Sequence, residues 1–419
     1  MECVLIGSRK SFESLNLSNI EDDLNELESL AYTLSFSVLD KNILNLKKIN
    51  PSTFYGKGQI KVISSQLSAI KCKYLIFNDD ISPSQYKNIQ KLLSKKIKIF
   101  DRTGLILEIF KRNAKTKEAK LQVELASLQY MLPRLTGQWT HLERQMGGVG
   151  TRGGPGEKQI EIDRRLIGVR ISKLKKDLTN IKKNRETQSA QRKNTFRVSL
   201  VGYTNAGKSS LLNSLTLPNT TYVKDKLFAT LDTTTKSVEI VRNKKVLVTD
   251  TVGFIKNLPH NLVASFRSTF EEVNSSDLIL IVVDSSQPRA VIKEHISTIN
   301  STLNEMNIVI QNKVLVMNKL DLIKDSSSIN YLKKKYPDAI FISARNHIMI
   351  DKVKEAIYGN VCMNQQVNKI KLPYNKSHLI NKIYSRYNVL ENISHDGFIE
   401  LSVSTTVEEL QNIKKMIRD

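Results

Sequence analysis

Short apolar runs alternate with longer amphipathic stretches along the first 115 residues. Val4–Ile6, Ser35–Leu39, Tyr74–Phe77 and Ile97–Phe100 each have the length of a strand, and the segments between them are polar enough for surface helices. This alternation predicts a small parallel α/β domain over residues 1–115. We identify no catalytic constellation in this part of the sequence.

The hydrophobic period changes at residue 116. From there, leucine and isoleucine recur every three or four positions in two separate stretches, which is the spacing of one face of a helix. The two stripes are Leu121, Leu125, Leu128 and Leu132, and Ile167, Ile171, Leu174, Leu178 and Ile181. They predict two helices paired as an antiparallel hairpin over residues 116–195.

A long glycine-rich connection joins the two stripes between Pro133 and Gly156. It carries the chain's single tryptophan, Trp139, together with three arginines and six of the 17 glycines. Glycine allows close backbone approach, arginine pairs with phosphate and tryptophan stacks on bases, so this tip suits a probe into folded RNA. A merely flexible linker is the alternative.

Continuous apolar runs of strand length follow between residues 196 and 362. They are Val198–Val201, Val246–Thr249, Leu278–Val283, Val314–Met317 and Ala339–Ile342. Buried parallel strands have this pattern, so residues 196–362 predict a domain with a mostly parallel sheet. Residues 363–419, with a strand at Phe398–Val403 and a helix at Val407–Ile417, predict a small C-terminal α+β module.

A phosphate-binding loop follows the first of these runs. Its residues are Gly202, Tyr203, Thr204, Asn205, Ala206, Gly207, Lys208 and Ser209. The two glycines let successive N–H groups point at one anion, Lys208 reaches the terminal phosphates, and the Ser209 hydroxyl is a magnesium ligand. The helix that starts there adds its positive end. The loop therefore predicts nucleotide binding, with Lys208 in a catalytic role.

Three further motifs stand at the ends of the later runs. They are Asp250, Thr251, Val252 and Gly253; Asn318, Lys319, Leu320 and Asp321; and Ser343, Ala344 and Arg345. Asp250 is placed to hold magnesium through water, and the Gly253 N–H to meet the γ-phosphate during catalysis. Asp321 accepts two hydrogen bonds from guanine, whereas adenine has no such donor pair. The ordered set predicts that residues 196–362 form a P-loop GTPase domain with GTP and GDP as ligands.

A threonine-rich segment lies between the phosphate-binding loop and Asp250. It contains Phe228, Ala229, Thr230, Leu231 and Asp232. We assign Thr230 as the second magnesium ligand and catalytic hydroxyl, with Thr234 in reserve; a solvated β-turn is the alternative for this segment. Phe254 follows Gly253 where Ras-like enzymes have a water-orienting glutamine, so intrinsic hydrolysis is expected to be slow.

Charge and composition narrow the class of partner. The chain carries 64 Lys and Arg against 41 Asp and Glu, a net charge of +23, and residues 116–195 hold 17 basic against 8 acidic residues. This excess suggests a polyanionic partner, although a solvated helix face is the alternative. The longest apolar runs are strand-sized and the three cysteines are scattered, which favours a cytoplasmic protein without a membrane span, disulfide framework or zinc site.

Several segments together resemble the HflX family of ribosome-associated GTPases. They are Thr53–Gly58, Asp101–Gly104 through Pro133–Leu135, Gly137–Arg165 and Phe228–Asp232. The resemblance implies Mg²⁺-dependent GTP hydrolysis stimulated by the ribosome, binding to the large ribosomal subunit by the N-terminal half, and dissociation of stalled or idle ribosomes. We expect the protein to be a monomer. The alternative is a GTP-binding RNA-remodelling or regulatory module in which hydrolysis is incidental. Thr233 and Ser210 depart from the common family pattern.

Overall fold

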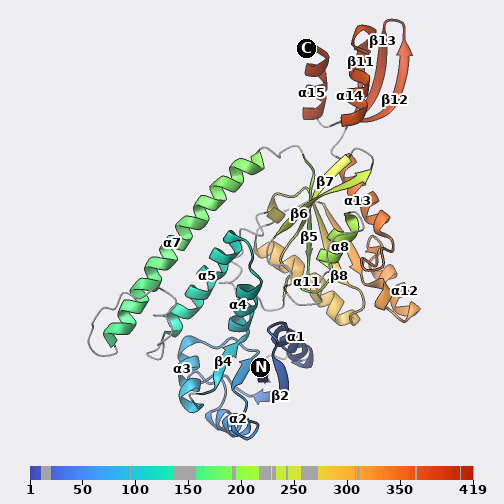
Figure 1. Ribbon diagram of the computed structural model, residues 1–419. Coiled ribbons are helices and arrows are strands. Elements are labelled where there is room, and N and C mark those ends of the chain that lie inside the picture. The colour runs from blue at the N-terminus through green and yellow to red at the C-terminus, as the bar shows by residue number, and fades with distance from the viewer. Residues whose placement is uncertain are drawn as a thin grey trace. The chain divides into compact units, whose positions relative to one another are not determined.

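The computed structural model describes most of the 419 residues (Figure 1). The described residues are 1–10, 20–94, 96–135, 157–190, 195–216, 228, 233–241, 244–255, 272–306, 308, 312–363, 366–405 and 407–418. They fall into two compact units. The first contains the described residues up to 189 together with Phe228, and the second contains the remainder.

The first unit contains a four-stranded parallel sheet with strand order β2-β1-β3-β4. Its elements are β1 (Glu2–Lys10), α1 (Ile20–Thr33), β2 (Ser37–Leu46), α2 (Lys57–Ala69), β3 (Tyr74–Phe77), α3 (Pro83–Leu92), β4 (Lys98–Asp101) and α4 (Arg102–Asn113). The predicted parallel α/β layer is therefore confirmed. The second strand begins two residues later than expected, because Ser35 has a left-handed φ of 65° that ends the turn after α1.

Alternate residues of the strands make one core. Val4, Ile6, Leu75, Phe77 and Ile99 lie in a single buried cluster together with apolar residues of α2 and α3. The intervening strand residues point to the opposite face of the sheet, because successive side chains alternate along a strand. Strands β1 and β3 are thus buried on both faces, which explains why they read as continuous apolar runs, whereas β2 at the edge of the sheet is largely exposed.

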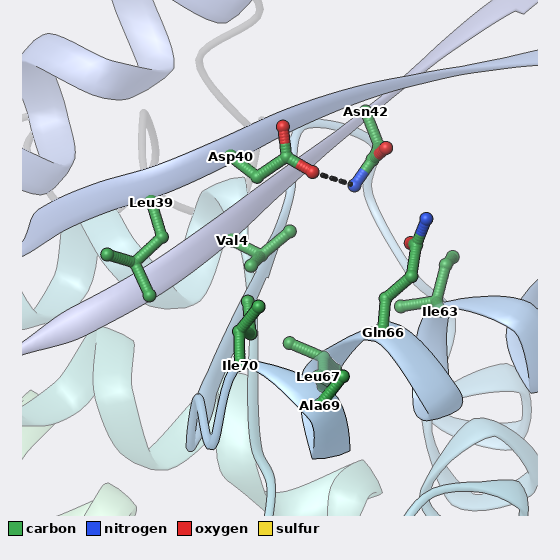
Figure 2. A pocket seen from close by; sticks show the side chains of 9 residues that line it. All are labelled: Val4, Leu39, Asp40, Asn42, Ile63, Gln66, Leu67, Ala69 and Ile70. Carbon is green, nitrogen blue, oxygen red and sulfur yellow. Dashed lines mark hydrogen bonds between the residues drawn. The ribbon is translucent and has the colours of Figure 1, made fainter.

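A shallow cavity of about 320 Å³ lies beside strands β1 and β2 and helix α2 (Figure 2). Its lining is Val4, Leu39, Asp40, Asn42, Ile63, Gln66, Leu67, Ala69 and Ile70, and Asn42 donates a hydrogen bond to Asp40 (3.2 Å). Val4 is near the amino end of its strand, whereas open α/β sheets bind ligands at the carboxyl ends. We assign this cavity no role.

Helices α5 (Lys117–Met131) and α7 (Glu157–Ala190) form the expected antiparallel hairpin (Figure 1). The Thr116 hydroxyl caps α5 by accepting a hydrogen bond from the Ala119 N–H (3.1 Å), so the helix begins where the hydrophobic period changes. Both predicted stripes meet in one apolar cluster, whose buried members include Leu128 and Leu174. The connection at residues 136–156 lies outside the described residues.

The second unit contains a six-stranded sheet of order β10-β9-β8-β5-β7-β6, in which the pair β6–β7 alone is antiparallel. Its elements are β5 (Arg197–Gly202), α8 (Lys208–Leu215), β6 (Thr234–Val241), β7 (Lys244–Asp250), β8 (Leu278–Asp284), α11 (Arg289–Glu305), β9 (Lys313–Asn318), α12 (Ser326–Lys335), β10 (Ile340–Phe341) and α13 (Ile350–Met363). The mostly parallel P-loop sheet is confirmed.

The C-terminal part of the chain forms a three-stranded antiparallel sheet of order β11-β13-β12. Its elements are β11 (Gln366–Pro373), α14 (Leu379–Arg386), β12 (Asn388–His395), β13 (Phe398–Thr405) and α15 (Val407–Arg418). Both helices pack on the same face of this sheet, where Ile383 and Ile413 are fully buried. The α+β module is confirmed, while the exact domain boundaries stay a prediction. No helix in the described part of the chain is long and apolar enough to cross a membrane.

Candidate nucleotide-binding site

The predicted phosphate-binding loop connects the end of β5 with the start of α8. At Gly202 a Cβ atom would lie 2.2 Å from the carbonyl oxygen of Val282, so a side chain does not fit beside strand β8. Gly207 has a left-handed φ of 89° and precedes the first residue of α8. The two glycines therefore satisfy two different demands, a close approach and a positive φ.

Lys208 is buried inside this loop. Its ammonium group donates hydrogen bonds to the carbonyl oxygens of Gly202 (3.0 Å) and Tyr203 (2.9 Å). Burial lowers the pKa of Lys208 to about 8, although the nearby carboxylate of Asp250 acts in the opposite direction. A terminal phosphate would supply the charge partner that the buried ammonium group needs.

The end of β7 lies against the same loop. The Ser209 hydroxyl donates a hydrogen bond to the Asp250 carboxylate (2.5 Å). Ser209 of α8 and Asp250 of β7, which we assigned to the metal, therefore lie side by side. A Cβ on Gly253 would lie 2.9 Å from the Lys208 ammonium nitrogen. Because Gly253 has no side chain, the space beside the Lys208 ammonium group stays open. Thr251 faces away, because its hydroxyl donates to the Leu200 carbonyl (2.7 Å).

Phe254 continues the backbone contact between this segment and the loop. Its N–H donates to the Gly202 carbonyl (3.0 Å), and its carbonyl accepts from the Thr204 N–H (2.7 Å). The Phe254 side chain is only 2% exposed. Phe254, which stands where Ras-like enzymes have glutamine, thus packs in the core and bonds to the backbone of the loop. Its side chain offers no polar group to an attacking water.

Asn318 joins three of the predicted motifs. Its amide nitrogen donates to the Ala206 carbonyl (2.9 Å), and its amide oxygen accepts from the Ala344 N–H (3.0 Å). Asparagine suits this position because its side chain carries a donor and an acceptor. The phosphate-binding loop and the segment after β10 are consequently fixed to the end of β9 by one buried side chain.

Asp321 lies next to the same segment. The Ser343 hydroxyl donates to its carboxylate (2.5 Å), which leaves further lone pairs for guanine donors. Lys319 has a left-handed φ of 64°, and its ammonium group forms an ion pair with Asp284 (2.9 Å). Of the remaining predicted residues, Asn205 also has a left-handed φ, Leu320 donates its N–H to a carbonyl after β10, Val252 is buried and Arg345 is exposed.

Asp284 is a residue that the sequence analysis missed. Hydrogen bonds from Ser286 and Lys319 and the charge of Lys319 lower its pKa, although burial alone would raise it. The signal was present, since Asp284 ends the buried run of β8 in the same way as Asp250 ends that of β7.

The threonine-rich segment is described at one position only. Phe228 is placed, and its side chain packs in the first unit; Ala229, Thr230, Leu231 and Asp232 lie outside the described residues. The assignments of Thr230 to the metal and to catalysis therefore stay predictions.

A phosphate-binding loop at a strand end, an aspartate-ended neighbouring strand and an Asn-Lys-Leu-Asp motif tied to that loop define a P-loop GTPase. Family models match along the chain: "GTP-binding GTPase N-terminal" over residues 21–111, "GTP-binding GTPase Middle Region" over 113–192 and "50S ribosome-binding GTPase" over 197–319. The chain belongs to the HflX family of GTPases.

Curated relatives named GTPase HflX support this membership across the chain. That of Magnetococcus marinus is 40% identical, covering 91% of this chain and 87% of the relative, and that of Escherichia coli is 36% identical, covering 94% and 92%. A solved complex of SsGBP with GDP is 27% identical, covers 86% of this chain and 98% of that chain, and has a TM-score of 0.47. As a member of this family the protein is a GTPase that binds GTP and GDP.

Proposed function

We propose that this protein is a GTP-hydrolysing switch that binds the large ribosomal subunit and dissociates stalled or idle ribosomes. The observation that carries the proposal is the match of residues 197–319 to a family of 50S ribosome-binding GTPases, in a chain whose other matched regions are the N-terminal and middle regions of GTP-binding GTPases.

The basic hairpin supports binding to ribosomal RNA. Lys175, Lys176, Lys182 and Lys183 are exposed on α7, on positions that the apolar stripe does not occupy. Lysines on one element attract phosphate over long distances and release counterions on binding. The hairpin is therefore our candidate for the part that binds RNA. In this proposal its glycine-rich tip enters the folded RNA.

Mg²⁺ fits the donors that this site offers. Ser209 and Asp250 supply a hydroxyl and a carboxylate, which are hard oxygen ligands, and Mg²⁺ usually takes few protein ligands together with waters and phosphates. When bound, the ion would neutralise charge on the β- and γ-phosphates. We assign Ser209 as a direct ligand, Asp250 as a ligand through water and Thr230 as the ligand specific to the GTP state.

The expected slow basal hydrolysis supports a partner-activated switch. The buried Phe254 side chain cannot orient water, so a group from elsewhere must do so. The same observation is compatible with a second function, a GTP-binding RNA-remodelling or regulatory module in which hydrolysis is incidental.

Titration of purified ribosomal subunits into a GTPase assay separates the two functions. We expect large, saturable stimulation by the large subunit, and GTP-dependent separation of 70S ribosomes observed by light scattering. Absence of stimulation by either subunit would favour the second function. Stimulation without separation of 70S ribosomes would retain the switch and reject ribosome dissociation.

A further inference from the structure

Helix α11 packs against strands β5 and β8, and β5 leads directly into the phosphate-binding loop (Figure 1). The buried stripe of the helix includes Ile292 and Ile299. His295 lies on the same face, because it is three residues after the first isoleucine and four residues before the second. A half-buried histidine thus takes the place of an apolar residue on the side of α11 that is packed against the sheet.

The His295 ring stacks on the ring of Tyr203, the second residue of the phosphate-binding loop. The ring centroids are 3.8 Å apart and the two planes are inclined by 13°. The Tyr203 side chain is only 7% exposed, so it packs inside the protein and does not line the open surface of the loop. The stack joins the loop to α11 by side chains, in addition to the backbone bonds within the loop.

The backbone of Tyr203 orients Lys208. The Tyr203 carbonyl oxygen accepts hydrogen bonds from the Lys208 ammonium group (2.9 Å) and from the Ala206 N–H (3.2 Å). The N–H of Thr204, which belongs to the same planar peptide group, donates to the Phe254 carbonyl (2.7 Å). This peptide group is therefore held by hydrogen bonds at both of its polar atoms, and the stacked ring holds the Cα atom next to it.

We propose that His295 is a positioning residue for the binding of nucleotide phosphates. By stacking on Tyr203, it holds the carbonyl group that orients the Lys208 ammonium group towards the phosphates. Helix α11 thereby takes part in phosphate binding through the loop. All of these residues belong to one compact unit. The inference rests on the assigned role of Lys208 and does not depend on the ribosome.

The test compares two variants of the full-length protein in the absence of ribosomes. His295→Leu removes the ring but keeps an apolar side chain on α11, and His295→Phe keeps a ring that can stack. We expect His295→Leu to bind GDP and GTP about three- to tenfold more weakly, the range expected for one aromatic contact, and His295→Phe to stay within about twofold of the wild type. Guanosine, which has no phosphate, should bind to both variants as it binds to the wild type.

The pH dependence of GTP affinity provides a second measurement. Burial holds the pKa of Lys208 at about 8, and a loosened loop would admit water and raise that pKa towards 10.5. The GTP affinity of His295→Leu should consequently begin to fall at a higher pH than that of the wild type or of His295→Phe. A loss of stability alone would not move this pH profile.

His395→Leu is a matched control. It removes another histidine stack, on Phe398 of the C-terminal sheet, with 5.0 Å between the ring centroids, and should leave nucleotide affinity unchanged. Wild-type GDP affinity in His295→Leu, an equal loss in His295→Phe, an equal loss for guanosine or an unshifted pH profile would overturn the inference.

Lys208→Met tests the assigned role of the lysine separately. Normal GDP affinity in this variant would reject that role and the inference with it. If GDP affinity is lost in Lys208→Met but is normal in His295→Leu, only the role of His295 is rejected.

Discussion

At the scale of single residues, the site depends on groups whose surroundings differ from water. The Lys208 ammonium group is buried among backbone carbonyls, and Asn318 uses both ends of its amide to join segments far apart in the chain. Both arrangements are costly without a partner and strong with one, because buried polar groups interact in a low dielectric. Loss of the Lys208 ammonium group should therefore weaken nucleotide binding, whereas loss of the Asn318 amide should also destabilise the fold, because it removes the partner of two buried backbone groups.

The lowered pKa of Lys208 predicts proton uptake on GTP binding at alkaline pH. The loop holds this lysine with a pKa of about 8, below its usual 10.5, and phosphate favours the charged form. At a pH between 8 and 10.5, Lys208 of the free protein has released its proton, whereas Lys208 of the GTP complex retains it. GTP affinity should therefore fall as pH rises through 8, by up to about tenfold per pH unit. By the same linkage, the stability of the free protein should rise with pH in this window, since the unfolded lysine is still protonated.

Calorimetry on the alkaline side of this pKa, in buffers of different ionisation enthalpy, measures this proton uptake directly. Guanosine, which carries no phosphate, is the control and should bind without uptake. Equal uptake with GTP and guanosine would show that another group titrates.

Asp321→Asn should change base preference from GTP towards XTP. The amide N–H can meet the xanthine carbonyl where the carboxylate met the guanine amino group. Competition binding with GTP, XTP and ATP measures the change. Ser343→Ala removes only the neighbouring hydroxyl (2.5 Å from the carboxylate) and should retain the preference for GTP. A variant Asp321→Asn that still strongly prefers GTP would remove Asp321 from base recognition.

At the scale of elements, a buried polar cluster joins β4 to the base of the glycine-rich tip. Arg134 forms an ion pair with Asp101 (3.1 Å), donates to the Ile81 carbonyl (2.7 Å) and lies over the Tyr130 ring, 3.8 Å from its centroid. The Tyr130 hydroxyl also donates to Asp101 (2.6 Å), and burial raises the pKa of Asp101. The segments around Asp101 and Arg134, which are 33 residues apart in the sequence, thus join in one buried polar cluster.

Arg134→Met should destabilise the first unit by about 3–5 kcal/mol, because it leaves the buried Asp101 carboxylate without its cation. The double variant with Asp101→Asn removes that uncompensated charge and should recover part of the stability. Urea unfolding followed by circular dichroism measures both. Arg170→Met, which breaks the half-exposed pair with Glu124 (2.7 Å), is the control and should cost about 1 kcal/mol or less. Equal destabilisation at the two arginines would contradict the argument.

At the scale of the whole molecule, the net charge of +23 matters through its distribution. Lysines along α7 are exposed on a helix whose opposite side is packed against α5, so they form a charged face rather than scattered charges. Such a face acts over long distances and depends on salt, whereas the nucleotide site acts at short range.

Replacing Lys175, Lys176, Lys182 and Lys183 with glutamine should weaken binding to the large ribosomal subunit. Each lysine–phosphate interaction that the substitutions remove should reduce the slope of log affinity against log salt by roughly 0.7 to 0.9. Pelleting with large subunits over a salt series measures this slope. A variant with glutamine at Lys324, Lys333, Lys334 and Lys335, which are exposed in the GTPase domain, has the same net charge and should keep the wild-type slope. If the slope of log affinity against log salt were equal in both variants, the effect would come from net charge alone and not from the charged face of α7.

The sequence by itself determined the class of protein, the strand-and-helix order and the nucleotide motifs. Those features are local: the phosphate-binding loop needs its residues in one contiguous run, and buried strands and helix stripes have periods readable in a short window. The antiparallel pairing of β6 with β7 was not anticipated, because it has no distinctive local pattern. Asp284 was missed although it ends a buried run in the same way as Asp250, because its pairing with Lys319 depends on the folded sheet.

Only the tertiary structure decided which distant groups meet. Asn318 and Ala206 are 112 residues apart, Asn113 and Phe228 are 115 apart, and Arg134 and Asp101 are 33 apart. The identity of an asparagine or arginine says that it needs partners, but not which ones, because a hydrogen bond depends on distance and angle in space. The folded sheet and helices bring those groups within bonding distance, and so convert separate motifs into one site.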